Sequence, residues 1–242
     1  MKLKLKLSLM VIAIMAIVIA TATTVLVQRA TKIAKELTKD KVTYLVRQRC
    51  EYWAGRVDGF YQVLHTISNN MNYYENVNVN QRRDQYEATI NSIFEDVPDF
   101  IRLFTIWKPD ALDGMDSRYI GRVGSTETGQ FAYALSRETG QIVPQTSLVV
   151  QEAMTFMNSG SLKDDASHPT ATTVAGKQVN QVRLMVPIVN KNNQVVGVVG
   201  AQVNLDMLQP RIESTMKNFD EISAISIYSS NGFIMASYAP DR

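Results

Sequence analysis

The chain has 242 residues, which is enough for one or two domains with a sizeable core. Its 25 basic and 23 acidic residues leave a formal net charge of +2, and it carries no basic motif, so we expect no nucleic-acid partner. The single cysteine, Cys50, excludes an intramolecular disulfide and a thiolate metal cluster, and we expect it to be a small buried residue.

The N-terminal segment predicts a membrane anchor. Residues 1–6 alternate lysine with apolar residues, and residues 7–27 contain no charge. A helix of that length spans about 30 Å, the thickness of a bilayer's hydrocarbon core. The positive-inside rule then places residues 1–6 in the cytoplasm and everything after residue 28 outside it. A cleaved signal peptide is the alternative, because Ala20 and Ala22 form a small-x-small cleavage pattern.

Residues 28–70 predict one long helix. No proline interrupts them, and apolar residues recur at spacings of three and four. The early part is rich in charge, and we expect it to be a solvated stalk that pairs with the stalk of a second copy in a homodimer. The later part, with Trp53, Phe60 and Leu64, is expected to lie on a sheet.

Shorter elements follow this helix. The spacing of apolar residues and of turn residues predicts them in this order: a helix at 81–96, a strand at 100–107, a loop at 108–128, a hairpin at 129–145, a helix at 147–158 and a polar connection at 163–176. After residue 206 the pattern predicts a helix to about residue 218, broken early by Pro210, and then a strand, turn and strand at 222–237. Because an isolated hairpin is barely stable, we expect residues 209–242 to begin a second sheet module and the chain to be a fragment.

Residues 181–208 carry the clearest strand signal. Two runs rich in β-branched residues, 182–189 and 195–203, flank the polar linker 190–194, as in an antiparallel hairpin. Both runs are apolar at nearly every position, which is typical of strands covered on both faces. We expect a helix on one face, with a pocket as one candidate for the cover of the other.

No catalytic motif stands out. The sequence has no P-loop, no Gly-x-Ser-x-Gly and no His-Glu-x-x-His, so we expect no enzyme activity and no cofactor. His65 and His168 lie apart from any cysteine or carboxylate cluster in the sequence, and we expect no metal site. A binding function is therefore the more economical hypothesis.

Candidate ligand contacts are polar or aromatic residues within apolar strands. A buried Arg or Gln needs a partner, which is either a ligand or a local acid such as Glu138. Strand alternation puts Gln202 on the same face as Val198, which indicates an inward polar group. An anion would be held by Arg137 or Arg183. The expected binding residues are Trp107, Tyr133, Ser136, Arg137, Arg183 and Gln202.

Three stretches resemble the double Cache sensor domain of bacterial methyl-accepting chemotaxis proteins: residues 116–142, residues 187–208 with VVGVVGAQVNLDML, and ISIYSSNGFIMAS at 225–237. The resemblance implies an α+β fold in which two PAS-like antiparallel sheets stack along one helix. Residues 71–208 would be the membrane-distal, ligand-binding module, and residues 209–242 the start of the membrane-proximal one. It also implies a receptor in the bacterial inner membrane that senses a small molecule outside the cytoplasm.

The sequence departs from the amino-acid-binding branch of that family at two places. The Arg-x-Trp-Tyr run that holds a ligand carboxylate is absent before the helix at residue 151, and Gln202 replaces the Asp that holds the ammonium. We therefore do not expect an α-amino acid to be recognised in the usual way. Two other functions stay open: the same sensor attached to a histidine kinase or diguanylate cyclase, and a cleaved exported binding protein.

Overall fold

The computed structural model describes residues 2–146, 149–218, 224–228 and 234–238. The chain forms two compact units, Met1–Asp58 and Gly59–Arg242. In the first unit the described residues form a single helix, which is the larger part of α1 (Lys2–Asn72). The predicted long helix is confirmed, and it is continuous with the apolar N-terminal stretch. Cys50 is exposed in this helix, so the expectation that it is buried was wrong.

Helix α1 contains a stretch long and apolar enough to cross a membrane, and a signal sequence would have the same properties. The apolar side chains of this N-terminal stretch are exposed, as Leu9, Ile12 and Ile17 illustrate. Exposed apolar residues on every side of a helix are typical of a segment that contacts lipid. Length and composition therefore agree with the anchor expected from the sequence.

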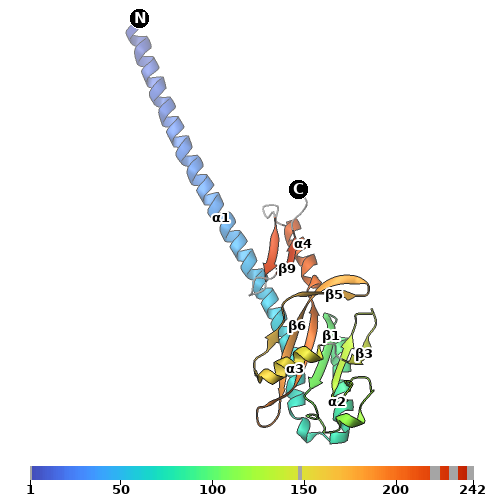
Figure 1. The fold of residues 1–242 in the computed structure, drawn as a ribbon. Coiled ribbons are helices and arrows are strands. Elements are labelled where there is room, and N and C mark those ends of the chain that lie inside the picture. The colour runs from blue at the N-terminus through green and yellow to red at the C-terminus, as the bar shows by residue number, and fades with distance from the viewer. Residues whose placement is uncertain (1, 147–148, 219–223, 229–233, 239–242) are drawn as a thin grey trace. The chain divides into compact units, whose positions relative to one another are not determined.

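The second unit is built on an antiparallel sheet of seven described strands in the order β3-β2-β1-β7-β6-β4, with β5 also paired to β6 (Figure 1). The strands are β1 (Phe100–Trp107), β2 (Ala132–Ser136), β3 (Val143–Thr146), β4 (Asp165–Ala166), β5 (Thr170–Val174), β6 (Lys177–Val189) and β7 (Val195–Asn204). The predicted strand at 100–107 and both predicted hairpins are confirmed. The α+β class is confirmed as well.

The polar connection expected at 163–176 instead contains β4 and β5, and β6 begins at Lys177 rather than at Val182. Thr170 pairs with Gln181 and Val174 with Lys177 in this extension. The strands escaped the sequence analysis because most of their side chains are exposed or only half-buried, and strands without a buried face lack the apolar alternation that reveals them.

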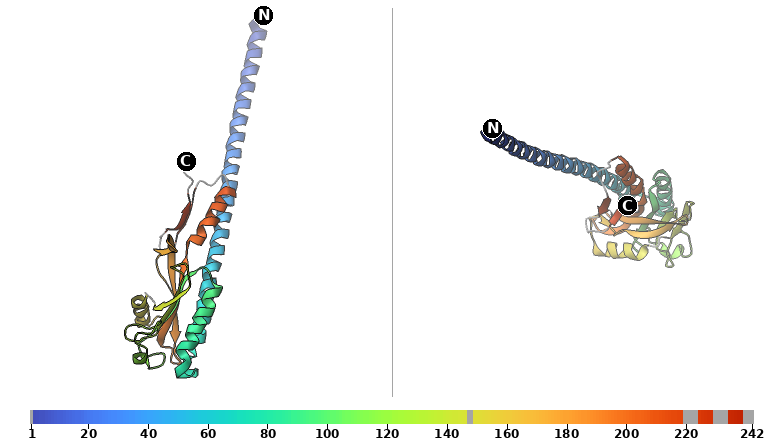
Figure 2. Two further views of the ribbon diagram at one scale, coloured as in Figure 1. Left: turned by 90° about the vertical axis from the view of Figure 1, so that its right-hand side faces the viewer. Right: turned by 90° about the horizontal axis from the view of Figure 1, so that it is seen from above.

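One face of the sheet is covered by the end of α1 and by α2 (Arg82–Asp96), as Figure 2 shows. The apolar positions of α1 in this unit recur at spacings of three and four, so they form one stripe towards the sheet. The buried residues of this layer include Phe60, Leu64, Ile67 and Met71 of α1, Tyr86, Ile90 and Phe94 of α2, and Leu103, Trp107, Leu135, Val186 and Val199 of the sheet.

The opposite face is covered by α3 (Val150–Ser159), which lies across the strands (Figures 1 and 2). Ala153 and Met157 of this helix are buried against Phe104, Ile106, Ala134, Met185 and Val198 of the sheet. The expectation that both faces of the hairpin are covered is confirmed. A helix, rather than an open pocket, covers this part of the second face.

Hydrogen bonds fasten the end of α1 to strands β4 and β6. The Ser68 hydroxyl donates to the Pro187 carbonyl at 2.6 Å, and the Asn72 side chain accepts the Val189 amide at 2.8 Å. The Tyr61 hydroxyl donates to the Asp165 carbonyl at 3.1 Å. Because buried polar groups without partners are costly, these bonds fix the position of the helix end along the strands.

The asparagine-rich sequence between β6 and β7 suits the turn that it forms. The Asn190 side chain accepts the backbone N–H groups of Asn192 at 2.9 Å and of Gln194 at 3.0 Å. Asn193 adopts the left-handed conformation, with a φ of 59°. Asparagine tolerates that conformation better than most residues and bonds readily to the nearby backbone, so it closes the hairpin at little cost.

The C-terminal part contains α4 (Gln209–Asn218) and an antiparallel pair, β8 (Ile225–Tyr228) and β9 (Ile234–Tyr238). These elements agree with the helix expected after residue 206 and with the described parts of the two expected strands; residues 222, 223 and 233 of those strands lie outside the described residues. The turn expected at 229–232 lies outside the described residues, as do residues 147 and 148 at the expected start of the helix that is now α3.

Replacing Gly200 in β7 by Ala is expected to destabilise the protein by roughly 1–3 kcal/mol, because an added methyl overpacks a full core. A Cβ at Gly200 would lie 2.4 Å from Phe104 Cζ and 2.6 Å from the Leu184 carbonyl oxygen. Chemical denaturation of the full chain in detergent measures the change. Gly59→Ala is the control, since a Cβ there meets nothing within 4 Å and should stabilise α1 slightly. Equal stability of the two variants would contradict the packing described.

Candidate ligand-binding site

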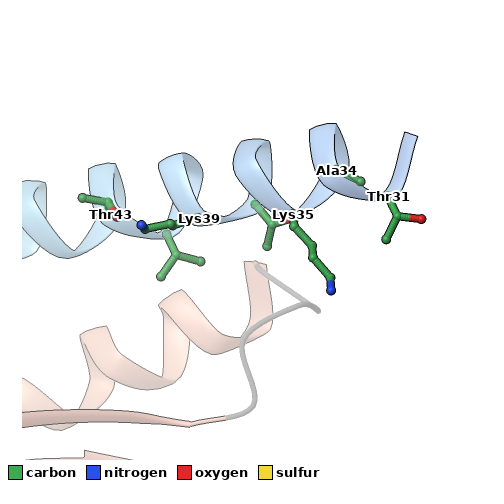
Figure 3. Close-up of a pocket in the computed structure, with 7 residues that line it drawn as sticks. Thr31, Ala34, Lys35, Lys39 and Thr43 are labelled. Atoms are coloured by element: carbon green, nitrogen blue, oxygen red, sulfur yellow. The ribbon is translucent and has the colours of Figure 1, made fainter. Parts of the chain in front are cut away.

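A shallow hollow runs along α1, and Figure 3 shows that its labelled residues all belong to that helix. Thr31, Lys35 and Lys39 follow one another at a spacing of four, so they mark one helix face. Small-molecule sites are concave and surround most of the ligand. A hollow lined by a single helix cannot surround a ligand, so it is a poor candidate site. The polar residues of the sheet are better candidates.

Strand alternation divides the six residues expected from the sequence into two groups. Trp107 and Tyr133 pack in the layer beneath α1 and α2, and Arg137 contacts the end of α2. Ser136, Arg183 and Gln202 lie on the opposite face, and Arg183 contacts Glu152 of α3. Because successive side chains of a strand point to opposite faces, neighbours such as Ser136 and Arg137 cannot line the same site.

Trp107 and Tyr133 are held by contacts within the α1–α2 layer. The Trp107 ring stacks on Tyr86 at a centroid distance of 5.9 Å, and its Nε1 donates to the Thr105 hydroxyl at 3.1 Å. The Tyr133 hydroxyl donates to Asn91 Oδ1 at 2.8 Å, and burial raises its pKa. Both side chains therefore have their polar atoms satisfied inside the protein.

Arg137 is held at the C-terminal end of α2. Its guanidinium donates to the carbonyls of Phe94 at 2.5 Å, Val97 at 3.1 Å and Phe100 at 2.9 Å, and it lies 3.9 Å from the centroid of the Phe94 ring. Burial lowers its pKa. The last carbonyls of a helix lack partners within the helix, and a cation there also suits the helix dipole. Arg137 acts as a cap for α2 in this structure.

A row of polar residues crosses the sheet on the α3 face. Arg102 of β1 pairs in register with Ser136 of β2 on one side and with Gln202 of β7 on the other. Gln202 pairs in turn with Arg183 of β6. Directly paired residues of antiparallel strands share a face and lie about 5 Å apart. The four side chains, Ser136, Arg102, Gln202 and Arg183, therefore form one continuous row across four strands, which we call the polar row.

Arg102 was missed by the sequence analysis, although it is the most deeply buried cation of the polar row, with 2% of its side chain exposed. The signal was present, since Arg102 interrupts the apolar strand β1 just as Arg183 interrupts β6. An isolated charge within an apolar strand is a stronger indication of a binding residue than an aromatic side chain there, because aromatic residues are common in cores and buried charges are rare.

Acidic side chains pair with the two arginines of the polar row. Arg102 donates to Glu138 Oε2 at 2.8 Å, and Arg183 pairs with Glu152 of α3 and, at 3.4 Å, with Asp165 of β4. The acids are more exposed than the arginines: 27% for Glu138, 58% for Glu152 and 40% for Asp165, against 15% for Arg183. The pairs thus connect the buried Arg102 and the half-buried Arg183 to partly hydrated acids.

Three buried atoms of the polar row have no hydrogen-bond partner within the part of the chain that the structure describes: Arg102 Nε, Arg183 Nε and Gln202 Oε1. An unmet buried donor or acceptor costs about 1–3 kcal/mol. Such atoms are rare in folded proteins and call for a specific explanation. Their concentration in one row makes the polar row our candidate ligand-binding site.

Arg83 of α2 is also buried, but none of its side-chain nitrogens is among the buried atoms without a hydrogen-bond partner. It donates to Asp113 at 2.7 Å, to Asp116 at 2.5 Å and to the Gly129 carbonyl at 2.9 Å. Burial raises the pKa of Asp116, and its bonds to the Asp110 backbone and to Arg83 act against that rise. The cluster holds the connection between β1 and β2 in place. Its donors are used within the protein, so it serves the fold.

The described residues contain no group of three or more His, Cys, Asp or Glu side chains that could hold a metal ion. His65 lies 3.0 Å from Asp164, and this pair is exposed. The chemistry available in the polar row is hydrogen bonding and charge pairing.

No protein-family model matches the sequence, and no curated protein matches it significantly. Solved structures do match the model. One is a methyl-accepting chemotaxis protein X, with a TM-score of 0.64 and 20% identity, covering 86% of this chain and 76% of the other. Another is the periplasmic sensory domain of the Campylobacter jejuni chemoreceptor Tlp1, with a TM-score of 0.55 and 17% identity, covering 77% and 69%.

A third is the extracellular domain of mmHK1S-Z3, a protein described as a histidine kinase, with a TM-score of 0.62 and 20% identity. The match covers 76% of this chain but only 64% of that domain. The chain has the fold of these sensory domains. This agrees with the Cache-like fold that the sequence resemblance implied, and the similar domains are sensory rather than catalytic.

Replacing Arg137 by Met is expected to destabilise the protein by roughly 2–3 kcal/mol, because three carbonyls lose a charged donor. Urea denaturation of the full chain in detergent measures this. Arg118→Met, at an exposed position, removes the same charge and should change stability little. A loss of stability that is no larger for Arg137→Met than for Arg118→Met would contradict the capping role.

Tyr86 predicts a pH dependence. Burial raises its pKa from 10.0 to about 12, so between these values the unfolded chain loses the proton while the folded chain keeps it. Deprotonation of Tyr86 therefore favours the unfolded chain. It does not affect the free energy of unfolding well below pH 10, and it lowers that free energy as the pH rises towards 12. Tyr86→Phe should therefore reduce the loss of stability between pH 8 and pH 11, measured by urea denaturation at both values.

The Tyr86 hydroxyl has no hydrogen-bond partner within the described residues, so Tyr86→Phe should not destabilise the protein at pH 8. The matched variant is Tyr61→Phe. Burial also raises the Tyr61 pKa to about 12, but its hydroxyl donates to the Asp165 carbonyl. That variant should lose stability at pH 8. The interpretation is wrong if both variants behave alike at pH 8.

Proposed function

We propose that the chain is the extracytoplasmic sensing part of a transmembrane chemoreceptor, which binds a small molecule and relays binding towards the membrane. The observation that carries this proposal is the polar row, in which three buried polar atoms have no hydrogen-bond partner among the described residues. The row lies in a chain whose fold is similar to that of sensory domains. The role is non-enzymatic. Its support is that the similar structures are sensory domains and that the contacts around the row suit binding.

The proposed organisation follows the sequence. Residues 1–6 lie in the cytoplasm, residues 7–27 cross the inner membrane, residues 28–70 form a stalk and long helix, residues 71–208 form the distal sensing module, and residues 209–242 begin a proximal module. The apolar stretch of α1 and the strand pair β8–β9 support this division. A cleaved exported binding protein is the alternative that the same apolar stretch would serve.

The polar row gives the site its residues. Ser136, Arg183 and Gln202, expected from the sequence, join Arg102 as proposed ligand contacts. We assign Trp107, Tyr133 and Arg137 to the support of the sheet, because their polar atoms bond within the α1–α2 layer. Glu152 connects α3 to Arg183, so α3 is the element that a ligand at the row would displace or tighten.

Asp165 offers a short route from the polar row to α1. Its carboxylate pairs with Arg183, and its backbone carbonyl accepts the Tyr61 hydroxyl of α1. On the α1 side, Asp164 contacts His65. A ligand that binds Arg183 would alter its pairing with Asp165 and so bias the arrangement of β4 against α1. A long helix is stiff enough to carry a small displacement.

We propose a homodimer through the stalk. Ile33, Leu37 and Tyr44 of α1 are large and exposed, at 57%, 65% and 67%, and they are separated by four and seven residues. That spacing places them on one helix face, which is the pattern of a seam between paired helices.

The output region that we propose is a chemotaxis signalling module, with a histidine kinase or diguanylate cyclase as the alternative.

A ligand screen tests the proposed function. The full chain in lipid nanodiscs is melted with a panel of small metabolites, and a ligand at 100 times its Kd should stabilise it by about 2.7 kcal/mol. Arg183→Gln should remove the stabilisation, whereas Arg118→Gln, at an exposed position, should keep it. The absence of any stabilising compound, or stabilisation that survives Arg183→Gln, would refute the site.

A further inference from the structure

The unmet atoms of the polar row define what a partner must offer. Arg102 Nε and Arg183 Nε are N–H donors, and Gln202 Oε1 is an acceptor. Gln202 pairs in register with both arginines, and neighbouring strands lie about 4.8 Å apart. The residue that carries the acceptor therefore lies between the two residues that carry the donors.

The two donors favour an anion. A guanidinium is always charged, and its N–H bonds to a carboxylate are roughly twice as strong as neutral hydrogen bonds. The acids already paired with these arginines contact terminal nitrogens and are partly exposed, so water screens them. The Nε atoms are buried and have no acceptor among the described residues. A ligand carboxylate would satisfy them on the inner side.

Gln202 restricts which anion fits. Its side-chain carbonyl oxygen repels a ligand carboxylate oxygen placed next to it. It accepts a hydrogen bond from a ligand hydroxyl or amide N–H. An ammonium group at the same place would lie between two guanidiniums, and the acids beside the row, Glu138, Glu152 and Asp165, already pair with those guanidiniums. Coulomb repulsion in a buried site is large, so an amino acid fits less well than the corresponding hydroxy acid.

On the basis of the sensor function proposed above, we propose that the polar row binds a small carboxylate with a hydroxyl or amide N–H on the carbon next to it. The carboxylate accepts from Arg102 Nε and Arg183 Nε, and the hydroxyl or amide N–H donates to Gln202 Oε1. No bond is made or broken, so the site recognises the compound without changing it.

A matched series of compounds tests the class. Lactate, propionate, alanine and lactamide share one carbon skeleton and differ in the groups that the row would read. The corresponding phenyl-substituted series (3-phenyllactate, 3-phenylpropionate, phenylalanine and 3-phenyllactamide) covers a larger skeleton. Binding to the full chain in lipid nanodiscs is measured by isothermal titration. In at least one series the hydroxy acid should bind about tenfold more tightly than each of the other three, because each analogue lacks one matched group or adds a repelling one.

Two variants locate the effect. Gln202→Met keeps the side-chain size, removes the acceptor and should make the hydroxy acid and the unsubstituted acid bind equally. Tyr86→Phe is the control: it removes another buried oxygen that lacks a partner among the described residues, but on the α2 side of the sheet, and the preference should be retained. Selectivity among compounds on the unmodified chain keeps the test valid if a variant fails to fold.

The outcomes separate this inference from the proposed function. If the metabolite panel yields a stabilising compound that depends on Arg183, but neither series favours the hydroxy acid, the sensor stands and the ligand class is wrong. Equal binding of alanine or lactamide, or a preference unchanged by Gln202→Met, also overturns the class. If nothing in the panel stabilises the chain, the sensor function itself fails.

Discussion

The structure depends on the burial of both faces of its central strands. Strands β1 and β7 lie in the middle of the sheet, with α1 and α2 on one side and α3 on the other. Every side chain of β1 is buried, so a polar residue there has no route to water. Such residues must find partners inside the protein or in a ligand. This constraint gives Arg102 and Gln202 their significance.

The two faces of the sheet differ in how their polar side chains are paired. On the α1–α2 face, Trp107, Tyr133 and Arg137 have internal partners, and hydrogen bonds fix the end of α1 to the strands. On the α3 face, the polar row leaves three atoms unmet among the described residues. The polar row therefore lies on the face of the sheet opposite the one that the end of α1 covers.

Some of the candidate site was predictable and some was not. Arg183 and Gln202 were recognised because they interrupt apolar runs, and Arg102 could have been recognised in the same way. Arg137, just after an apolar run, caps α2 instead, because the strand alternation after Ser136 turns it to the other face. Strands β4 and β5 could not be found, since exposed strands carry no apolar alternation and owe their existence to pairing with β6.

The sequence by itself determined the long helix, the strongest strands, the β6–β7 hairpin and the α+β class, because each follows from local apolar spacing and turn residues. It also indicated that Gln202 is an inward polar group. Only the tertiary structure decided which polar residues share a face, because that depends on the register between strands far apart in the chain. Register placed Arg102, Gln202 and Arg183 side by side, across a separation of about 80 residues between β1 and β6 that no local pattern encodes.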